Sequence, residues 1–142
     1  MRQIDTVIDI DAPARQVWQV LTDFRSYRTW NPFIVDAEGE AVQGARIAIT
    51  IAAGNRRVKL RPVVQVAARE RELRWIGHWI VPGLLDGEHS FRLEQRRESC
   101  RLHNAERFTG LLLRRFTDEL VEATRQGFIA MNRALKERAE DQ

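Results

Sequence analysis

His89 and Glu106 are the residues whose types and spacing are best suited to chemistry. The two segments that contain them, 88–97 and 100–109, alternate apolar and polar residues with the period of two that is typical of β-strands. An imidazole next to a carboxyl group can move a proton on a bound carbonyl or enol compound. The pair is therefore a candidate acid and base.

The two segments are expected to form a hairpin that turns at residues 98–99. In that register Phe91 faces Glu106, and His89 lies diagonally across from Glu106 on the same face, about 7–8 Å away between backbones. The apolar neighbours mark this face as the inner one, where a polar pair is costly unless it has partners. Simpler interpretations stay open: the pair orients a ligand, satisfies itself, or bonds Asn104 or the backbone.

Aromatic side chains on a neighbouring segment could form the wall of an apolar pocket. Trp75 and Trp79 share one strand face with Gly77, and flat aromatic ligands pack well on such a wall. Gly77 either leaves room for a ligand or marks a bulge, and ordinary core packing is the alternative for the tryptophans. Leu84 and Leu112 stand in or next to loops, where they could line a pocket mouth or contact a partner. The full set of expected ligand-binding residues is Trp75, Trp79, Phe91, Asn104, Phe108, Phe116, Leu120, Met131, Leu84 and Leu112.

Length and charge exclude several classes of function. The 142 residues suffice for one domain, 1–142, and the net charge of +3 is small. The arginines are scattered along the chain instead of clustered with aromatics, so nucleic-acid binding is not expected. No apolar run approaches the roughly 18 residues that span a membrane, and the N-terminus lacks the apolar core of a signal peptide. A cytoplasmic location is therefore expected.

Neither a metal site nor a cofactor is expected. His78, His89 and His103 do not share a strand face, and no cysteine–histidine spacing suits zinc. Cys100 is the single cysteine, which excludes an intrachain disulfide and fits a reducing compartment. Glycine-rich phosphate loops and a nucleophile-elbow serine are absent from the sequence.

The elements that must hold these residues follow a simple order. Alternating isoleucines predict a strand over 4–10, followed by a short helix that ends near Leu21 and a second turn over 24–30. Alternating strands then fill the chain from 33 to 108. Apolar residues recur every three or four positions over 113–135, which predicts an amphipathic helix of about 25 residues.

This order predicts an α+β fold. Strands in an unbroken run form antiparallel meanders, and a long amphipathic helix must bury its apolar stripe against them. We expect a curved antiparallel sheet of about six or seven strands that grips the long C-terminal helix, with short helices after the first strand. A hollow between the sheet and the helix would be the place for a ligand.

Short motifs along almost the whole chain resemble a known superfamily in the same order. They are Ile10-Asp11-Ala12-Pro13 with Val17-Trp18 and Leu21-Thr22-Asp23, Tyr27 with Trp30-Asn31-Pro32-Phe33, Pro82-Gly83-Leu84-Leu85-Asp86-Gly87-Glu88-His89-Ser90-Phe91, Glu106-Arg107-Phe108-Thr109-Gly110-Leu111-Leu112, and Gly127-Phe128 with Met131-Asn132 and Ala134-Leu135-Lys136. Together they resemble the START-like, birch-pollen-allergen-like helix-grip superfamily, often called SRPBCC, and its bacterial polyketide cyclase/dehydratase-like branch. The resemblance implies the helix-grip fold. Members include cyclases, dehydratases, lipid and hormone carriers, ubiquinone-binding proteins and chaperone activators, so the fold does not select one activity.

Three functions follow as alternatives. The first, which we favour, is binding of a hydrophobic or aromatic small molecule, lipid- or polyketide-like, in an internal cavity. The second is a polyketide cyclase/dehydratase-type enzyme that uses His89 and Glu106 as acid and base. The third is a homodimeric interaction module that uses the outer strand face of Arg74, Ile76, His78 and Ile80.

Overall fold

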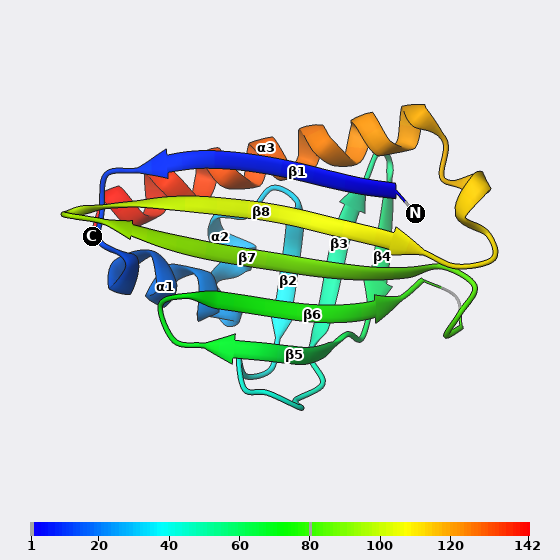
Figure 1. Ribbon diagram of the computed structural model, residues 1–142, viewed down its shortest axis with the longest axis horizontal. Coiled ribbons are helices and arrows are strands. Elements are labelled where there is room, and N and C mark those ends of the chain that lie inside the picture. The colour runs from blue at the N-terminus through cyan, green and yellow to red at the C-terminus, as the bar shows by residue number, and fades with distance from the viewer. Residues whose placement is uncertain (1, 80) are drawn as a thin grey trace.

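The computed structural model describes residues 2–79 and 81–142, and it confirms the predicted α+β fold (Figure 1). The elements in chain order are β1 (Arg2–Ile10), α1 (Ala14–Thr22), η1 (Phe24–Ser26), α2 (Tyr27–Trp30), β2 (Ile34–Glu38), β3 (Ala48–Ala53), β4 (Arg56–Leu60), β5 (Val63–Ala68), β6 (Glu72–His78), β7 (Asp86–Arg96), β8 (Ser99–Thr109), η2 (Leu113–Arg115) and α3 (Asp118–Glu140). The predicted order of a strand, short helices, a run of strands and a long helix is therefore confirmed.

The strands form two antiparallel sheets where the sequence predicts one. Five strands pair in the order β1-β8-β7-β6-β5, and three pair in the order β2-β3-β4. The described residues thus contain eight strands, and the expectation of six or seven is too low. Strand β2 is hard to recognise in the sequence because a register shift between Ile34 and Asp36 interrupts its alternation.

The short helices after β1 lie at one end of the core (Figure 1). Helix α1 buries Val17 and Leu21 completely, in agreement with the predicted apolar spacing. Asn31 ends α2, because its side-chain Oδ1 accepts hydrogen bonds from the backbone N–H groups of Phe33 (3.0 Å) and Ile34 (2.9 Å). The chain then enters β2 without a further turn.

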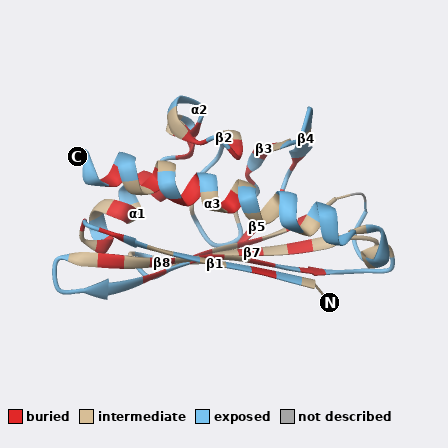
Figure 2. Cartoon of the chain, turned by 90° about the horizontal axis from the view of Figure 1, so that it is seen from above, coloured by how far each residue is buried: buried red, intermediate tan, exposed pale blue. Residues whose placement is uncertain are grey.

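Helix α3 lies on one side of the five-stranded sheet, and the other described helices lie on that side too (Figure 2). The helix begins at Asp118, because the side chain of Thr117 accepts a hydrogen bond from the N–H of Leu120 (3.2 Å) and caps it. The predicted helix starts too early, since residues 113–115 form the separate turn η2. The buried residues of α3 all lie from its middle onward: Phe128, Met131, Asn132, Leu135 and Ala139.

The hairpin of β7 and β8 differs from the predicted register by two residues. Arg96 pairs with Ser99, so the turn consists of Arg97 and Glu98, and His89 pairs directly with Glu106. Arg97 has a positive φ of 48°, which a residue other than glycine seldom adopts, and nothing in the sequence marks the turn at this position. The predicted diagonal arrangement is therefore wrong, and the true pair is closer.

Candidate functional site

His89 lies in a cluster of aromatic rings on the inner face of β7. Its imidazole is stacked between the rings of Phe91 (centroids 4.4 Å apart, 19° between planes) and Phe128 (4.7 Å, 15°), and Trp75 lies 5.3 Å away. Only 2% of the residue is exposed. Burial lowers the pKa of His89 to about 4, against the opposing effect of its hydrogen bond with Asn104. The imidazole is thus neutral at physiological pH.

A chain of hydrogen bonds determines which ring nitrogen of His89 carries the proton. Asn132 donates to the hydroxyl of Thr6 (2.9 Å), and that hydroxyl donates to the backbone carbonyl of Asn104 (2.7 Å). The amide of Asn104 donates to Asn132 Oδ1 (2.9 Å), which leaves Asn104 Oδ1 as the acceptor for His89 Nε2–H (2.7 Å). The opposite nitrogen, Nδ1, therefore carries a lone pair.

Glu106 faces this lone pair from the neighbouring strand. Its Oε1 lies 3.4 Å from His89 Nδ1, and the residue is 8% exposed. Burial raises the pKa of Glu106 to about 8, so the carboxyl group keeps its proton at neutral pH. Burial therefore moves the two pKa values in opposite directions and leaves both groups neutral, one as an acid and one as a base.

A glycine on β7 makes room for the Glu106 carboxyl group. A Cβ atom on Gly87 would lie 2.1 Å from Glu106 Oε2 and 3.3 Å from Trp79 Nε1. Glycine at position 87 is therefore a condition for the position of the carboxyl group, and it brings that group close to Trp79. Gly77 of β6 pairs with Gly87 in an unbroken register, so Gly77 does not mark a bulge between these strands.

Trp79 also lines an apolar pocket of about 200 Å³. The pocket lies between the first half of α3, the end of β3 and the indole of Trp79. Leu120 is 49% exposed at its edge, so the pocket is open to the outside. Its lining is Phe33, Ile51, Ala52, Ala53, Gly54, Trp79, Leu120, Ala123 and Thr124.

The structure places the expected ligand-binding residues in three different surroundings. Trp79 and Leu120 line the pocket. Five others are core residues with little or no exposure: Trp75, Phe91, Asn104, Phe108 and Met131. Of these, Asn104 belongs to the hydrogen-bond chain. Phe116 stacks on the ring of Phe108 at 4.4 Å, and the N–H of Leu112 bonds the carbonyl of Leu84 (2.9 Å), so these residues tie the loops together.

Several residues of the site are absent from the sequence-based set. Thr6 and Asn132 complete the hydrogen-bond chain, Phe128 covers His89, and Gly87 makes room for Glu106. A usable signal existed for two of them. Asn132 is a polar residue beside the apolar stripe of the helix, and Gly87 occupies an inward position of an alternating strand.

Other polar groups are engaged away from the pocket. His78 Nδ1 lies 2.7 Å from Asp86 Oδ1, and the Asp86 carboxylate also accepts from the N–H of Gly83. Burial raises the pKa of the Cys100 thiol, which disfavours a reactive thiolate. Of the outer strand face considered for a homodimer, Ile80 lies outside the described residues.

In the described part of the chain, no three histidine, cysteine or acidic side chains gather as metal ligands.

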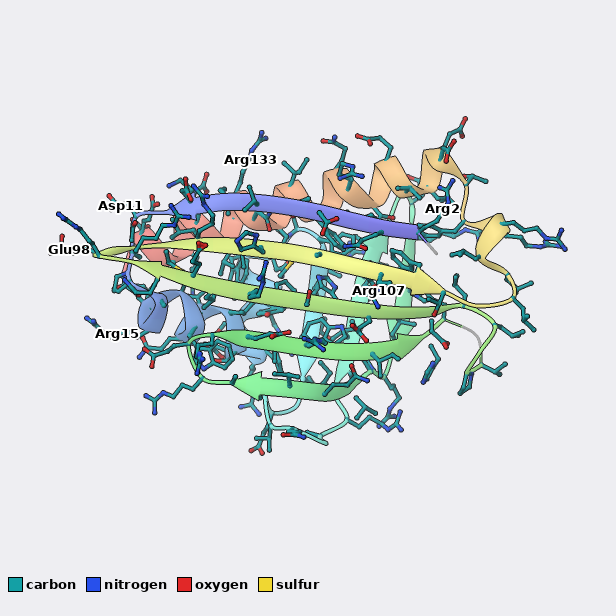
Figure 3. The ribbon with its side chains drawn as sticks, in the orientation of Figure 1. Arg2, Asp11, Arg15, Glu98, Arg107 and Arg133 are labelled. Atoms are coloured by element: carbon teal, nitrogen blue, oxygen red, sulfur yellow. The ribbon has the colours of Figure 1, made fainter. Side chains whose placement is uncertain are left out.

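Charged side chains are spread over the surface. In Figure 3, Arg15 on α1 and Arg133 on α3 lie apart from each other and from Arg2 and Arg107, which lie on the neighbouring strands β1 and β8. Within residues 2–79 and 81–142, no helix is both long and apolar enough to cross a membrane.

Comparison with known families decides the classification. The family model described as polyketide cyclase/dehydrase and lipid transport matches residues 1–140. The chain belongs to this family. A comparison with the sequences of curated proteins gives no significant match. The resemblance to the START-like helix-grip superfamily is confirmed, and folds of this type are typical of hydrophobic ligand binding.

Solved structures of family-like proteins share the whole fold at low identity. The ZhuI aromatase/cyclase of Streptomyces sp. R1128 superposes with a TM-score of 0.77 at 19% identity, over 98% of this chain and 93% of that one. A START superfamily protein of Mycobacterium smegmatis gives 0.79 at 14% identity, over 98% and 97%. A protein of Thermus thermophilus gives 0.80 at 13% identity, over 99% and 98%. The superpositions support the fold of this family member. At such low sequence identity they indicate no particular ligand.

Proposed function

We propose that this family member binds a hydrophobic aromatic small molecule, polyketide- or lipid-like, with its apolar part in the pocket beside Trp79. The observation that carries the proposal is the double position of Trp79: it lines the apolar pocket, and its Nε1 lies 3.3 Å from the Cβ position of Gly87, which Glu106 Oε2 approaches to 2.1 Å. Small-molecule sites are commonly apolar with a few convergent polar groups, and this site has that composition. A volume of about 200 Å³ suits two or three fused or linked rings.

Blocking the pocket tests the proposal directly. The probe is the uncharged dye N-phenyl-1-naphthylamine, whose fluorescence rises in apolar surroundings, and we expect saturable binding at one site. Ala123→Phe places a ring in the pocket and should weaken binding at least about tenfold, because the space that a ligand needs is occupied. The matched control is Ala130→Phe, the same change at an exposed residue of α3 outside the pocket lining.

The two variants distinguish binding in the pocket from non-specific hydrophobic binding. Dye affinity that is lost in Ala123→Phe and kept in Ala130→Phe supports the proposal. Equal binding by both variants would refute this location. Native mass spectrometry of protein purified from its own host would then identify the class of the natural ligand, if one is retained.

A second function, acid–base catalysis of the cyclase/dehydratase kind, is favoured by one specific observation. The lone pair of His89 Nδ1 and the protonated carboxyl group of Glu106 are 3.4 Å apart, and their pKa values are driven apart by burial. Such a pair could relay a proton to an enolisable ligand. The test is hydrogen–deuterium exchange at the α-carbon of 2-tetralone, followed by NMR.

An enzyme and a carrier give opposite results in this assay. Catalysis predicts that Glu106→Gln abolishes the accelerated exchange while affinity for the dye is kept. A binding protein predicts exchange no faster than in buffer for the wild type, and effects of the same substitution on affinity alone.

A further inference from the structure

Two polar groups lie near the backbone of Gly87, next to Trp79, which also lines the pocket. Glu106 Oε2 and Trp79 Nε1 both lie within 3.3 Å of the position that a Cβ atom of Gly87 would take. Neither atom forms a hydrogen bond with another side chain or backbone group in the described part of the protein. The indole nitrogen can only donate a hydrogen bond. Which ligand group fits between the two atoms therefore depends on whether Oε2 donates or accepts.

The hydrogen-bond chain makes Oε2 an acceptor. The amide N–H of Asn104 donates to Asn132 Oδ1, and Asn104 Oδ1 accepts the proton of His89 Nε2. The other ring nitrogen, Nδ1, therefore carries the lone pair, and it lies 3.4 Å from Glu106 Oε1. A protonated carboxyl group therefore carries its hydrogen on Oε1, toward this lone pair, and Oε2 is the carbonyl oxygen. An ionised carboxylate would also present Oε2 as an acceptor. The result does not depend on the protonation state.

We propose that Glu106 Oε2 and Trp79 Nε1–H together recognise a hydroxyl group of an aromatic or enolic ligand. The hydroxyl hydrogen is donated to Oε2, and the hydroxyl oxygen accepts from the indole N–H. This inference rests on the proposed function, because the ring that bears the hydroxyl group occupies the pocket beside Trp79. An ether or a ketone presents only an acceptor, so its oxygen would face Oε2 without a hydrogen between them.

Three probes of similar shape test the inference: 2-naphthol, 2-methoxynaphthalene and 2-methylnaphthalene. Their affinities are measured by displacement of N-phenyl-1-naphthylamine near neutral pH. We expect the wild type to bind 2-naphthol at least about tenfold more tightly than either of the other probes, because a site built for a hydroxyl group discriminates against analogues without one. Hydrophobicity alone would give the reverse order, since the methyl compound is the most apolar.

Substitutions at the two recognising residues assign the preference. Glu106→Leu should bring the affinity ratio of 2-naphthol to 2-methylnaphthalene to about one or below, because the acceptor is gone. Glu106→Gln should keep the preference, because its amide can donate to His89 Nδ1 and leave its oxygen toward the pocket. Trp79→Phe keeps a ring and removes the N–H, so the ratio should fall several-fold. Leu120→Ala, which removes only apolar lining, should weaken all three probes by a similar factor.

The outcomes distinguish the two proposals. Equal affinity of the wild type for the three probes, or a preference for the ether, would overturn hydroxyl recognition and leave the apolar pocket standing. Absence of saturable binding for all three would refute the proposed function together with this inference. If Glu106→Leu does not fold, Trp79→Phe and Glu106→Gln still decide the question, because retained preference in the first or lost preference in the second contradicts the assignment.

Discussion

Comparing the wild type with Glu106→Gln shows how the proton on the buried Glu106 carboxyl group affects the free energy of unfolding. Burial raises the pKa of Glu106 from its ordinary 4.5 to about 8. Between these values the folded protein holds a proton that the unfolded chain has released, so the folded state binds more protons and stability falls as the pH rises. The stabilising contribution is fully present below pH 4.5 and is lost by about pH 8.

The size of the effect follows from the width of this window. Each pH unit within it changes the free energy of unfolding by about 1.4 kcal/mol. Between about pH 5 and about pH 7.5 the wild type should therefore lose about 3 kcal/mol relative to Glu106→Gln. Glutamine does not ionise, and titrations elsewhere occur in both proteins. Those include His89, whose lowered pKa makes its contribution present above pH 6.5 and lost as the pH falls through about 4.

Urea unfolding of both proteins at the two pH values gives the difference directly. The control is Glu94→Gln on the exposed face of β7, where the hydrogen bond from Arg96 lowers the carboxyl pKa. Its contribution has the opposite sign, since it is present at higher pH and lost on acidification, and solvent keeps it small. A free-energy difference between wild type and Glu106→Gln that does not change with pH would mean that Glu106 is already ionised in the folded protein. The proton assignment at the site would then be wrong.

Three further substitutions test the packing of the site, each by urea unfolding. Gly87→Ala should cost about 2 kcal/mol, because the new Cβ atom overlaps the carboxyl group of Glu106 at 2.1 Å, and an unchanged stability would show that the group moves freely. Asn132→Leu should cost about 3 kcal/mol, because it leaves the buried Asn104 amide N–H without an acceptor and the Thr6 hydroxyl without its donor, and nitrogen NMR should show His89 losing its fixed tautomer. Phe128→Ala should cost about 4 kcal/mol through the cavity beside the imidazole, and a loss below about 1 kcal/mol would contradict that packing.

The members of the inner face could be predicted from the sequence, and their exact pairing could not. Alternation places His89 and Glu106 on one face whether the hairpin turns at 98–99 or one position earlier, because a shift of two residues in the pairing leaves every side chain on its own face. The pairing itself depends on the turn. Arg97 takes a conformation that usually signals glycine, so local sequence rules point elsewhere.

The location of the pocket depends on tertiary packing that periodicity does not encode. Leu120 and Leu135 belong to the same apolar stripe of α3, yet Leu120 is 49% exposed and Leu135 is completely buried. The difference arises because the first half of the helix faces the end of β3 and Trp79, across the pocket, while the second half packs closely. A helical pattern gives the direction of each side chain and not the distance to the layer opposite.

The polar chain through the core is better explained by ligand recognition than by stability. Apolar side chains of similar shape in place of Asn104, Asn132 and His89 would avoid the desolvation of several polar groups, and such replacements are often neutral or stabilising. Gly87 adds flexibility to the unfolded chain and removes side-chain packing from the folded one. These features have one consequence in common, which is that an oxygen of Glu106 lies beside Gly87 with a fixed hydrogen-bonding character. Departures from the sequence that would fold most stably are expected to concentrate where a protein recognises its ligand, and here they concentrate around His89 and Glu106.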